Sequence, residues 1–235
     1  MTKVFCAIDT PDLSRAVSLS SVLSNTGCGL KLGLEFFMSN GPVGVQSIRN
    51  AYPDIPIFLD LKFHDIPNTV AGALRAVTRL DVQYLNLHAG GGLEMMRAGL
   101  DAVHFEADRL GIAAPRLLAV TVLTSIDQAS LSGVGVDADI ENQVLRLARL
   151  TKNAGLAGVV CSAKEIEILR KDLGDDFILM VPGIRPQGSD NQDQKRVMSP
   201  VEAINLGASH LVIGRPITEA VDPQIAVADI MSSLA

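Results

Sequence analysis

The sequence is poor in aromatic residues. The 235 residues include no tryptophan and only two tyrosines, and aromatic residues make up 4 % of the chain. Proteins that hold single-stranded nucleic acids stack the bases on aromatic side chains. Runs of lysine and arginine are also missing, and the formal net charge is −6. A nucleic-acid surface needs a basic patch, so we expect no nucleic-acid partner, and a few local cations must meet any anionic ligand.

Cysteine and long apolar runs are scarce as well. Cys6, Cys28 and Cys161 lie far apart, within or beside apolar segments. An odd, widely spaced set fits neither a disulfide framework nor a zinc site and indicates reduced core thiols in a cytoplasmic protein. The N-terminal residues lead almost directly into a strand, so we expect no signal peptide. No apolar run approaches the roughly 20 residues of a membrane span, and we expect a soluble protein with no membrane partner.

What the sequence does contain is a regular alternation. Apolar residues make up 48 % and charged residues 20 % of the chain, an ordinary globular balance. Short β-type apolar runs alternate with longer helical patterns. We predict eight strands, at residues 4–9, 29–34, 55–63, 84–89, 116–123, 158–162, 177–184 and 210–217.

Helix-start signals lie between the predicted strands. Asp12 or Ser14 can cap the first helix, Pro42 stands near the start of the second, and Pro67 precedes the third. Strands alternating with helices imply parallel βαβ units. Eight units of about 29 residues each predict a (β/α)₈ barrel, with residues 1–235 as a single catalytic domain. A doubly wound open sheet is the alternative.

Two connections are longer and more polar than the others. They are residues 124–139, after the fifth strand, and residues 185–197, after the seventh. Both follow the carboxyl ends of strands, the face on which barrel enzymes carry their active sites. Long loops at this face are typical of lids that close over a substrate.

The third predicted strand carries charges where the barrel should be apolar. Side chains alternate along a strand, so Asp60 and Lys62 share one face and point into the mouth of the barrel. Lys31, in the neighbouring second strand, lies close to them. A buried unpaired charge costs several kcal/mol, so these groups must pair with one another or meet a ligand. Since apolar residues would serve the fold at least as well, their presence suggests function.

Each of these residues also has a structural interpretation. Asp60 and Lys62 could form a buried ion pair without a catalytic role. Asp65, ahead of Ile-Pro, could cap the third helix. His64 fits a packing or hydrogen-bonding role near the site, and His88 fits a structural or interface role at the end of its strand. Asp9, at the end of the first strand, fits turn initiation and ligand contact equally well.

A phosphate site is predicted after the last two strands. The seventh ends in PGIRPQG and the eighth in IGRPI. Barrels often hold a phosphate in these two loops, through backbone N–H groups. Gly183 and Gly214 allow close approach of the backbone, Arg185 and Arg215 supply charge, and Gln187 adds an uncharged donor.

Taken together, these residues resemble the orotidine 5′-phosphate decarboxylase family. The resemblance covers essentially the whole chain and rests on these motifs: Asp9 in AIDTPD, Lys31 in LKLG, Asp60, Lys62 and Asp65 in DLKFHD, and the stretches DIPNT, VTVLTS, VPGIRPQG and VIGRPI. Metal-dependent sugar-phosphate relatives share the DxKxxD pattern but carry an acidic metal ligand on the second strand. Lys31 stands there in this chain, and Glu35 comes four residues later.

The resemblance implies loss of CO₂ from orotidine 5′-monophosphate to give UMP, in pyrimidine biosynthesis, with no cofactor and no metal. It implies that Lys62 stabilises and protonates the C6 carbanion, with Asp60 near the departing carboxylate and Lys31 completing the charge network. Further implied contacts are those of Asp9 and Lys31 with the ribose, of Thr124 and Ser125 with the pyrimidine, and of Gln187, Gly214, Arg215 and Arg185 with the phosphate. It also implies a homodimer, in which Asp65 and Thr69 complete the site of the partner subunit.

Three rival functions stay open from the sequence. A metal-dependent sugar-phosphate decarboxylase or aldolase of the same suprafamily is disfavoured by Lys31. A Schiff-base aldolase using Lys62 is disfavoured by Asp60, because a neighbouring carboxylate keeps the lysine charged. A nucleotide-binding barrel without catalysis would not need Lys31, Asp60, Lys62 and Asp65 together.

Overall fold

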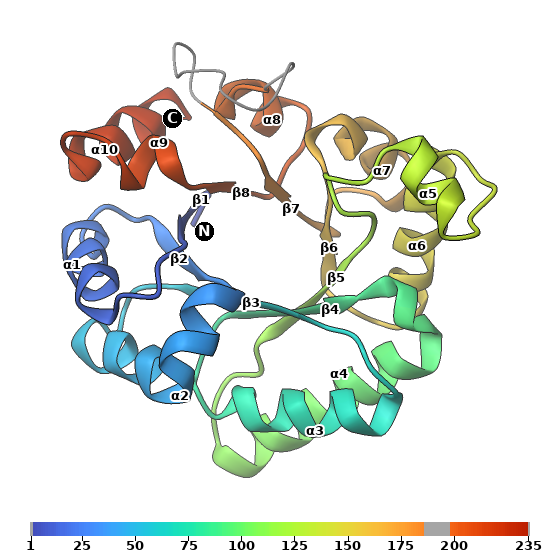
Figure 1. Ribbon diagram of the computed structural model, residues 1–235, viewed down its shortest axis with the longest axis horizontal. Helices are drawn as coiled ribbons and strands as arrows, with labels where there is room; N and C mark the ends of the chain where they lie inside the picture. Colours follow the sequence, from blue (N-terminus) through green and yellow to red (C-terminus); the bar gives the residue numbers. More distant parts are fainter. Residues whose placement is uncertain (1, 186–197, 235) are drawn as a thin grey trace.

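The strands of the chain close into a ring. The computed structural model describes residues 2–185 and 198–234. Its strands are β1 (Val4–Ile8), β2 (Gly29–Leu32), β3 (Ile57–Phe63), β4 (Tyr84–His88), β5 (Arg116–Val120), β6 (Gly158–Val160), β7 (Ile178–Pro182) and β8 (His210–Ile213). Each strand pairs in parallel with the next, and β8 pairs with β1. The predicted (β/α)₈ barrel is confirmed, and the open sheet is excluded (Figure 1).

Helices surround this ring, as Figure 1 shows. They are α1 (Leu13–Leu23), α2 (Leu34–Ala51), α3 (Pro67–Thr78), α4 (Gly92–Leu110), α5 (Gln128–Gly133), α6 (Ile140–Asn153), α7 (Ile166–Leu173), α8 (Pro200–Asn205), α9 (Arg215–Thr218) and α10 (Pro223–Ser233), with short 3₁₀ turns η1 (Ala89–Gly91) and η2 (Ala163–Glu165). Asp12 caps α1 through bonds from the backbone N–H groups of Ser14 and Arg15, which confirms the predicted cap.

Several boundaries differ from the prediction. The eighth strand ends at Ile213, and residues 215–217 belong to α9. Pro216 lies in the first turn of that helix, where the missing N–H of proline costs nothing. Helix α2 begins at Leu34, well before Pro42, and is interrupted at Gly41, whose φ of 59° is not helical. Pro42 therefore begins the second half of this helix and not the helix itself.

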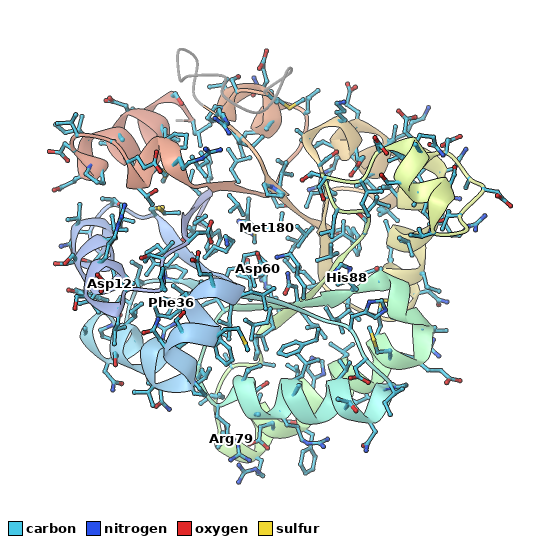
Figure 2. The ribbon with its side chains drawn as sticks, in the orientation of Figure 1. Asp12, Phe36, Asp60, Arg79, His88 and Met180 are labelled. Carbon is cyan, nitrogen blue, oxygen red and sulfur yellow. The ribbon has the colours of Figure 1, made fainter. Side chains whose placement is uncertain are left out.

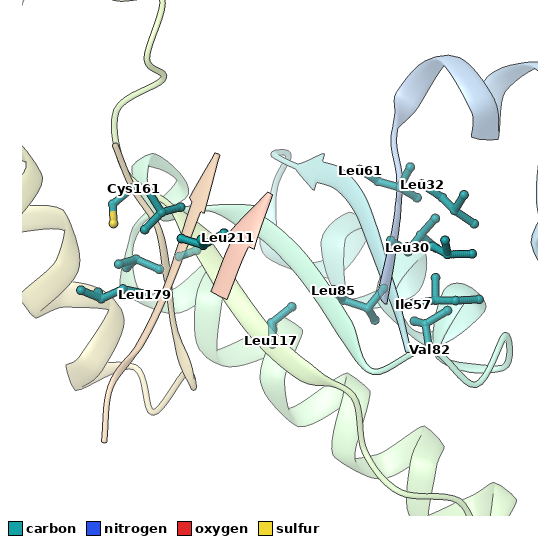
Figure 3. Packing of buried hydrophobic residues seen from close by; sticks show 14 of the residues in the cluster. Leu30, Leu32, Ile57, Leu61, Val82, Leu85, Leu117, Cys161, Leu179 and Leu211 are labelled. Carbon is teal, nitrogen blue, oxygen red and sulfur yellow. The ribbon is translucent and has the colours of Figure 1, made fainter. Parts of the chain in front are cut away.

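Apolar side chains fill the layer between strands and helices. Leu30, Leu32, Ile57 and Leu85 are completely buried on the outer face of the ring (Figure 3). Each such side chain stabilises the fold by about 2 kcal/mol relative to an exposed one. The three cysteines are buried and free, as expected. Among the described residues, no helix is both long enough and apolar enough to cross a membrane.

The amino-terminal end of the barrel is closed by aromatic side chains. Phe5, Phe58 and Tyr84 pack edge to face inside the ring, with ring centroids 5.5–6.4 Å apart. His210 Nδ1 lies 2.7 Å from the carbonyl of Thr2, and Nε2 lies 2.9 Å from the Tyr84 hydroxyl. Because a carbonyl only accepts, Nδ1 carries the hydrogen and Nε2 accepts from Tyr84. This end is packed and its polar groups are paired, so the barrel opens at the carboxyl ends of its strands.

Candidate active site

A cavity of about 360 Å³ opens at the carboxyl ends of the strands. Of the predicted site residues, these line it: Asp9, Lys31, Asp60, Lys62, Thr124, Gly183, Arg185, Gly214 and Arg215. Ser125, the neighbour of Thr124, is exposed and lies outside the lining. Gln187 and the rest of the predicted lid, residues 186–197, lie outside the described residues. The other predicted lid, residues 124–139, contains helix α5, which Asp127 caps.

An alternating row of charges crosses the floor of this cavity. Lys31 Nζ lies 3.0 Å from Asp9 Oδ1 and 3.6 Å from Asp60 Oδ2. Lys62 Nζ lies 2.7 Å from Asp60 Oδ1. The row therefore runs Asp9, Lys31, Asp60, Lys62, from β1 across β2 to β3. The predicted proximity of Lys31 to the third strand is confirmed, and Asp60 points into the ring in Figure 2.

Asp60 stays ionised in this setting. Burial by itself would raise the pKa of its carboxyl group, but the charges of Lys31 and Lys62 lower it. Hydrogen bonds from Lys62 and Asn86 act in the same direction, so the pKa lies below its ordinary value. This carboxylate lies within ion-pairing distance of both lysine side chains. The site thus presents a fixed cation, Lys62, at the open end of the row.

Room for this row depends on a glycine that the sequence analysis did not select. A Cβ on Gly33, which follows β2, would lie 3.0 Å from Lys31 Nζ and 3.2 Å from Asp9 Oδ1. Both contacts are tighter than side chains ordinarily make, so the ion pair would have to shift. In the sequence, the only indication of this role was the pattern K-L-G, which places a glycine two residues after Lys31 at the end of a strand.

Asn86 was also missed. It lies on β4, is completely buried, and donates from Nδ2 to Asp60 Oδ1 at 2.6 Å. Its Oδ1 accepts from the backbone N–H of Lys62 at 2.8 Å. The signal was a polar residue between Leu85 and Leu87, on the face of the strand that points into the barrel.

The two Gly-Arg loops follow the neighbouring strands β7 and β8, and both line the cavity. Gly183 adopts a φ of 79°, which favours glycine, and Gly214 is the residue before α9. A Cβ on Gly214 would find only ordinary contacts, the nearest being 3.5 Å away. Within residues 2–185 and 198–234, no atom therefore crowds a Cβ at this position. Arg185 and Arg215 line the cavity from these loops.

Asp65 and Thr69 lie outside the cavity of their own chain. Both are exposed, and Asp65 Oδ1 accepts from the N–H of Ile66 at 2.6 Å. The N-cap of α3 is Ile66, with no side-chain capping bond, so the interpretation of Asp65 as a helix cap is wrong. His64 and His88 stack with ring centroids 5.3 Å apart, in keeping with the packing role predicted for His64 and the structural role predicted for His88.

A metal site was not predicted. In residues 2–185 and 198–234, no three histidine, cysteine or acidic side chains gather in a way that could hold a metal ion. Glu35 is exposed in the first turn of α2.

Fold and site define the class of the protein. It is a (β/α)₈-barrel enzyme whose charged cavity lies at the carboxyl ends of the strands. The family described as "Orotidine 5'-phosphate decarboxylase / HUMPS family" matches residues 2–230. The chain belongs to this family.

Proteins that bear the name orotidine 5′-phosphate decarboxylase resemble the chain over almost its full length. The one from Rhodospirillum rubrum is 56 % identical over 94 % of this chain and 89 % of its own. The one from Paramagnetospirillum magneticum is 49 % identical over 98 % and 97 %, respectively. Among solved structures, orotidine 5′-phosphate decarboxylase from Lactobacillus acidophilus superposes with a TM-score of 0.88 at 34 % identity, covering 100 % of this chain and 99 % of that one.

Proposed function

We propose that the chain converts orotidine 5′-monophosphate to UMP and CO₂ without a cofactor, as an orotidine 5′-phosphate decarboxylase of de novo pyrimidine biosynthesis. The observation that carries this proposal is the row Asp9–Lys31–Asp60–Lys62 on the cavity floor, with ion-pair distances of 2.7–3.6 Å. The names and high identity of the relatives support it. The family description also covers HUMPS proteins, so the experiment must separate the two.

Lys62 supplies the group that the reaction needs. When the bond from C6 to the carboxylate breaks, the electron pair stays in an sp² orbital on C6 that the ring does not delocalise. Most decarboxylases use a cofactor as an electron sink. A fixed ammonium beside C6 instead stabilises the developing carbanion and then gives it a proton. Lys62 afterwards regains its proton from solvent through the open mouth of the cavity.

Asp60 holds the side chain of Lys62 in position. Its carboxylate lies 2.7 Å from the ammonium, close to the position of the departing carboxylate. Lys31 balances Asp60 on the other side and, with Asp9, contacts the hydroxyl groups of the ribose. Lys31 is held at 3.0 Å by Asp9, whose side chain is 58 % exposed and so reaches the part of the cavity that a sugar would fill.

The remaining contacts divide between the two ends of the substrate. Thr124, in the lining, and its neighbour Ser125 hold the pyrimidine edge. Gly214 and Arg215 hold the phosphate, together with Arg185 and with Gln187, which lies outside the described residues. Phosphate binding far from C6 provides binding energy that organises the reacting centre.

The active form that we propose is a homodimer in which Asp65 and Thr69 complete the partner's site. Both side chains are exposed, and neither lines the charged cavity of its own chain. Large apolar side chains that are 49–78 % exposed lie on α2 and before α3, namely Leu34, Met38, Val43 and Ile66. Apolar groups exposed together at a rim are typical of a protein–protein interface. A second copy of the chain would cover them.

Mixing two inactive variants tests this arrangement. Lys62→Ala and Asp65→Ala homodimers each lack one half of every composite site. After unfolding and refolding together, half of the dimers are mixed, and each mixed dimer has one intact site. We expect about a quarter of the native activity to return if the dimer has two-fold symmetry. Activity that stays at the level of the separate variants would contradict a shared site.

Residues 1–235 form one catalytic domain that acts in the cytoplasm, with the nucleotide substrate and product as its small-molecule partners and with neither nucleic acid nor membrane as a partner. The net charge of −6 supports the exclusion of nucleic acid.

Ultraviolet absorbance tests the reaction directly. Purified protein is mixed with orotidine 5′-monophosphate in excess EDTA, and we expect the spectrum of UMP to replace that of the substrate. The same protein with Mg²⁺ and pentose or hexose phosphates serves as the comparison, for which we expect no product. The opposite pattern would contradict the proposal and favour a metal-dependent sugar-phosphate enzyme.

A further inference from the structure

The pairing of β3 with β4 is irregular at the floor of the cavity. Between the paired positions Leu59–Leu85 and Phe63–Leu87, β3 advances four residues while β4 advances two. One inward side chain of β4, Asn86, therefore faces a stretch of β3 that contains both Asp60 and Lys62. An extra stretch of this kind leaves backbone groups without their ladder partners.

Lys62 bends the backbone in this stretch. Its φ of 52° lies in the left-handed region, which only one other non-glycine residue of the described chain, Asp81, also occupies. A side chain with a Cβ is strained in this conformation, so surrounding contacts must hold it there. The backbone N–H of Lys62 donates to Asn86 Oδ1 at 2.8 Å, in place of a ladder bond to β4.

The other half of the same amide orients Asp60. Asn86 Nδ2 donates at 2.6 Å to Asp60 Oδ1, the oxygen that also accepts from Lys62 Nζ at 2.7 Å. The second oxygen of Asp60 then faces Lys31 at 3.6 Å. Asn86 is completely buried, so no solvent competes for these bonds.

We propose that Asn86 is a positioning residue for the reaction: its amide holds the left-handed backbone at Lys62 and the plane of the Asp60 carboxylate, and so places the Lys62 ammonium. Both functions need one donor and one acceptor on a single short side chain, which an amide has and a carboxylate or an alkyl group lacks. The inference rests on the proposed decarboxylation. It adds a residue that acts through Lys62 and Asp60 and does not touch the substrate.

Two variants separate the two halves of the amide. Asn86→Leu removes both bonds and keeps the number and branching of the side-chain heavy atoms. Asn86→Asp keeps the acceptor for the Lys62 N–H but replaces the donor to Asp60 by a second carboxylate. Leu85→Ala is the matched control, because Leu85 is fully buried in the same strand but points to the helices. All are compared with the native protein by steady-state kinetics on orotidine 5′-monophosphate and by circular dichroism.

We expect kcat to fall at least about 100-fold in both Asn86 variants, since a misplaced reacting group costs about that much. KM should change less than about fivefold, because the phosphate end of the cavity is untouched. In Asn86→Asp, two facing carboxylates share a proton, so the acidic limb of the kcat–pH profile should move up by about one unit or more. Leu85→Ala should keep kcat within about threefold of the native value, whatever stability it loses.

A folded Asn86→Leu protein with kcat within about threefold of native would overturn the proposal, as would a rise in KM at unchanged kcat. If both Asn86 variants are unfolded where Leu85→Ala is folded, Asn86 serves the fold and the proposal is equally overturned. A native protein that does not decarboxylate the substrate at all refutes the proposed function instead. The native control thus distinguishes the two failures.

Discussion

Replacing Asp60 by asparagine perturbs the centre of the charge row. The carboxylate lies 2.7 Å from Lys62 Nζ and 3.6 Å from Lys31 Nζ. With an effective dielectric constant of about 20, Coulomb attraction at these distances is about 6 and about 5 kcal/mol. Desolvation of the buried ions opposes most of this, and removing one partner of a buried pair costs roughly 3–5 kcal/mol. Because the side chain of Lys62 is 28 % exposed, we expect the free energy of unfolding to fall by about 3 kcal/mol, the lower end of that range.

Replacing Lys62 by methionine should have a much smaller effect on stability. Asp60 then keeps its pair with Lys31, and a partly buried ammonium is exchanged for an apolar side chain. We expect the free energy of unfolding to change by less than about 1 kcal/mol. Turnover should be lost in both variants, so stability and activity separate in Lys62→Met.

Urea unfolding followed by circular dichroism measures this difference. All proteins are compared at one concentration, because association shifts apparent stability. Asp101→Asn, an exposed carboxylate on α4, is the matched control and should stay within about 0.5 kcal/mol of native. Equal stability of Asp60→Asn and native protein would refute the electrostatic reasoning. So would a loss in Lys62→Met as large as that in Asp60→Asn.

Three further outcomes follow from other parts of the structure. In steady-state kinetics, Arg215→Ala should raise KM about 10- to 100-fold, because the substrate loses one hydrogen bond to a charged group. A loss in the free energy of unfolding as large as the loss in binding free energy would contradict a phosphate role. His210 is buried, which lowers its pKa. As the pH falls below about 6.5, the unfolded chain therefore binds the proton more readily than the folded chain, and stability falls. Urea unfolding at pH 7 and pH 5 should show a smaller fall in His210→Gln, and equal falls would contradict this. A Cβ on Gly158 would overlap the carbonyl oxygen of Ile178 on β7. In the same assay, Gly158→Ala should therefore lower the free energy of unfolding by about 2–3 kcal/mol. Unchanged stability would contradict this close packing of β6 against β7.

The order of the elements was predictable from the sequence, because parallel strands of a barrel are buried on both faces and form short apolar runs. The residues at which the strands end were less predictable. Apolar residues continue past the last ladder bond, as in residues 215–217, which form the start of α9. The change from strand to helix there takes place in the backbone at Gly214 and Pro216. The hydropathy of the side chains does not indicate this boundary.

The charge row was predictable because alternation along a strand puts Asp60 and Lys62 on one face. That reasoning assumed a regular strand, whereas Lys62 has a left-handed backbone and β3 has two more residues than β4 between their paired positions. Asn86 was missed for the same reason. A single amide in an apolar strand usually makes a structural hydrogen bond in the core. The position of Asn86 beside both Asp60 and Lys62 depends on the irregular pairing of β3 with β4, which cannot be read from the sequence of either strand alone.

The central claim is that Lys62 performs the chemistry. The most direct test is the rate of UMP formation from orotidine 5′-monophosphate, measured in EDTA for native protein and for folded Lys62→Ala. The account predicts that the native protein turns over and that the variant loses about four orders of magnitude in kcat or more, since it lacks both the electrostatic stabilisation and the proton donor. A Lys62→Ala protein that retains kcat within about tenfold of native would contradict the account.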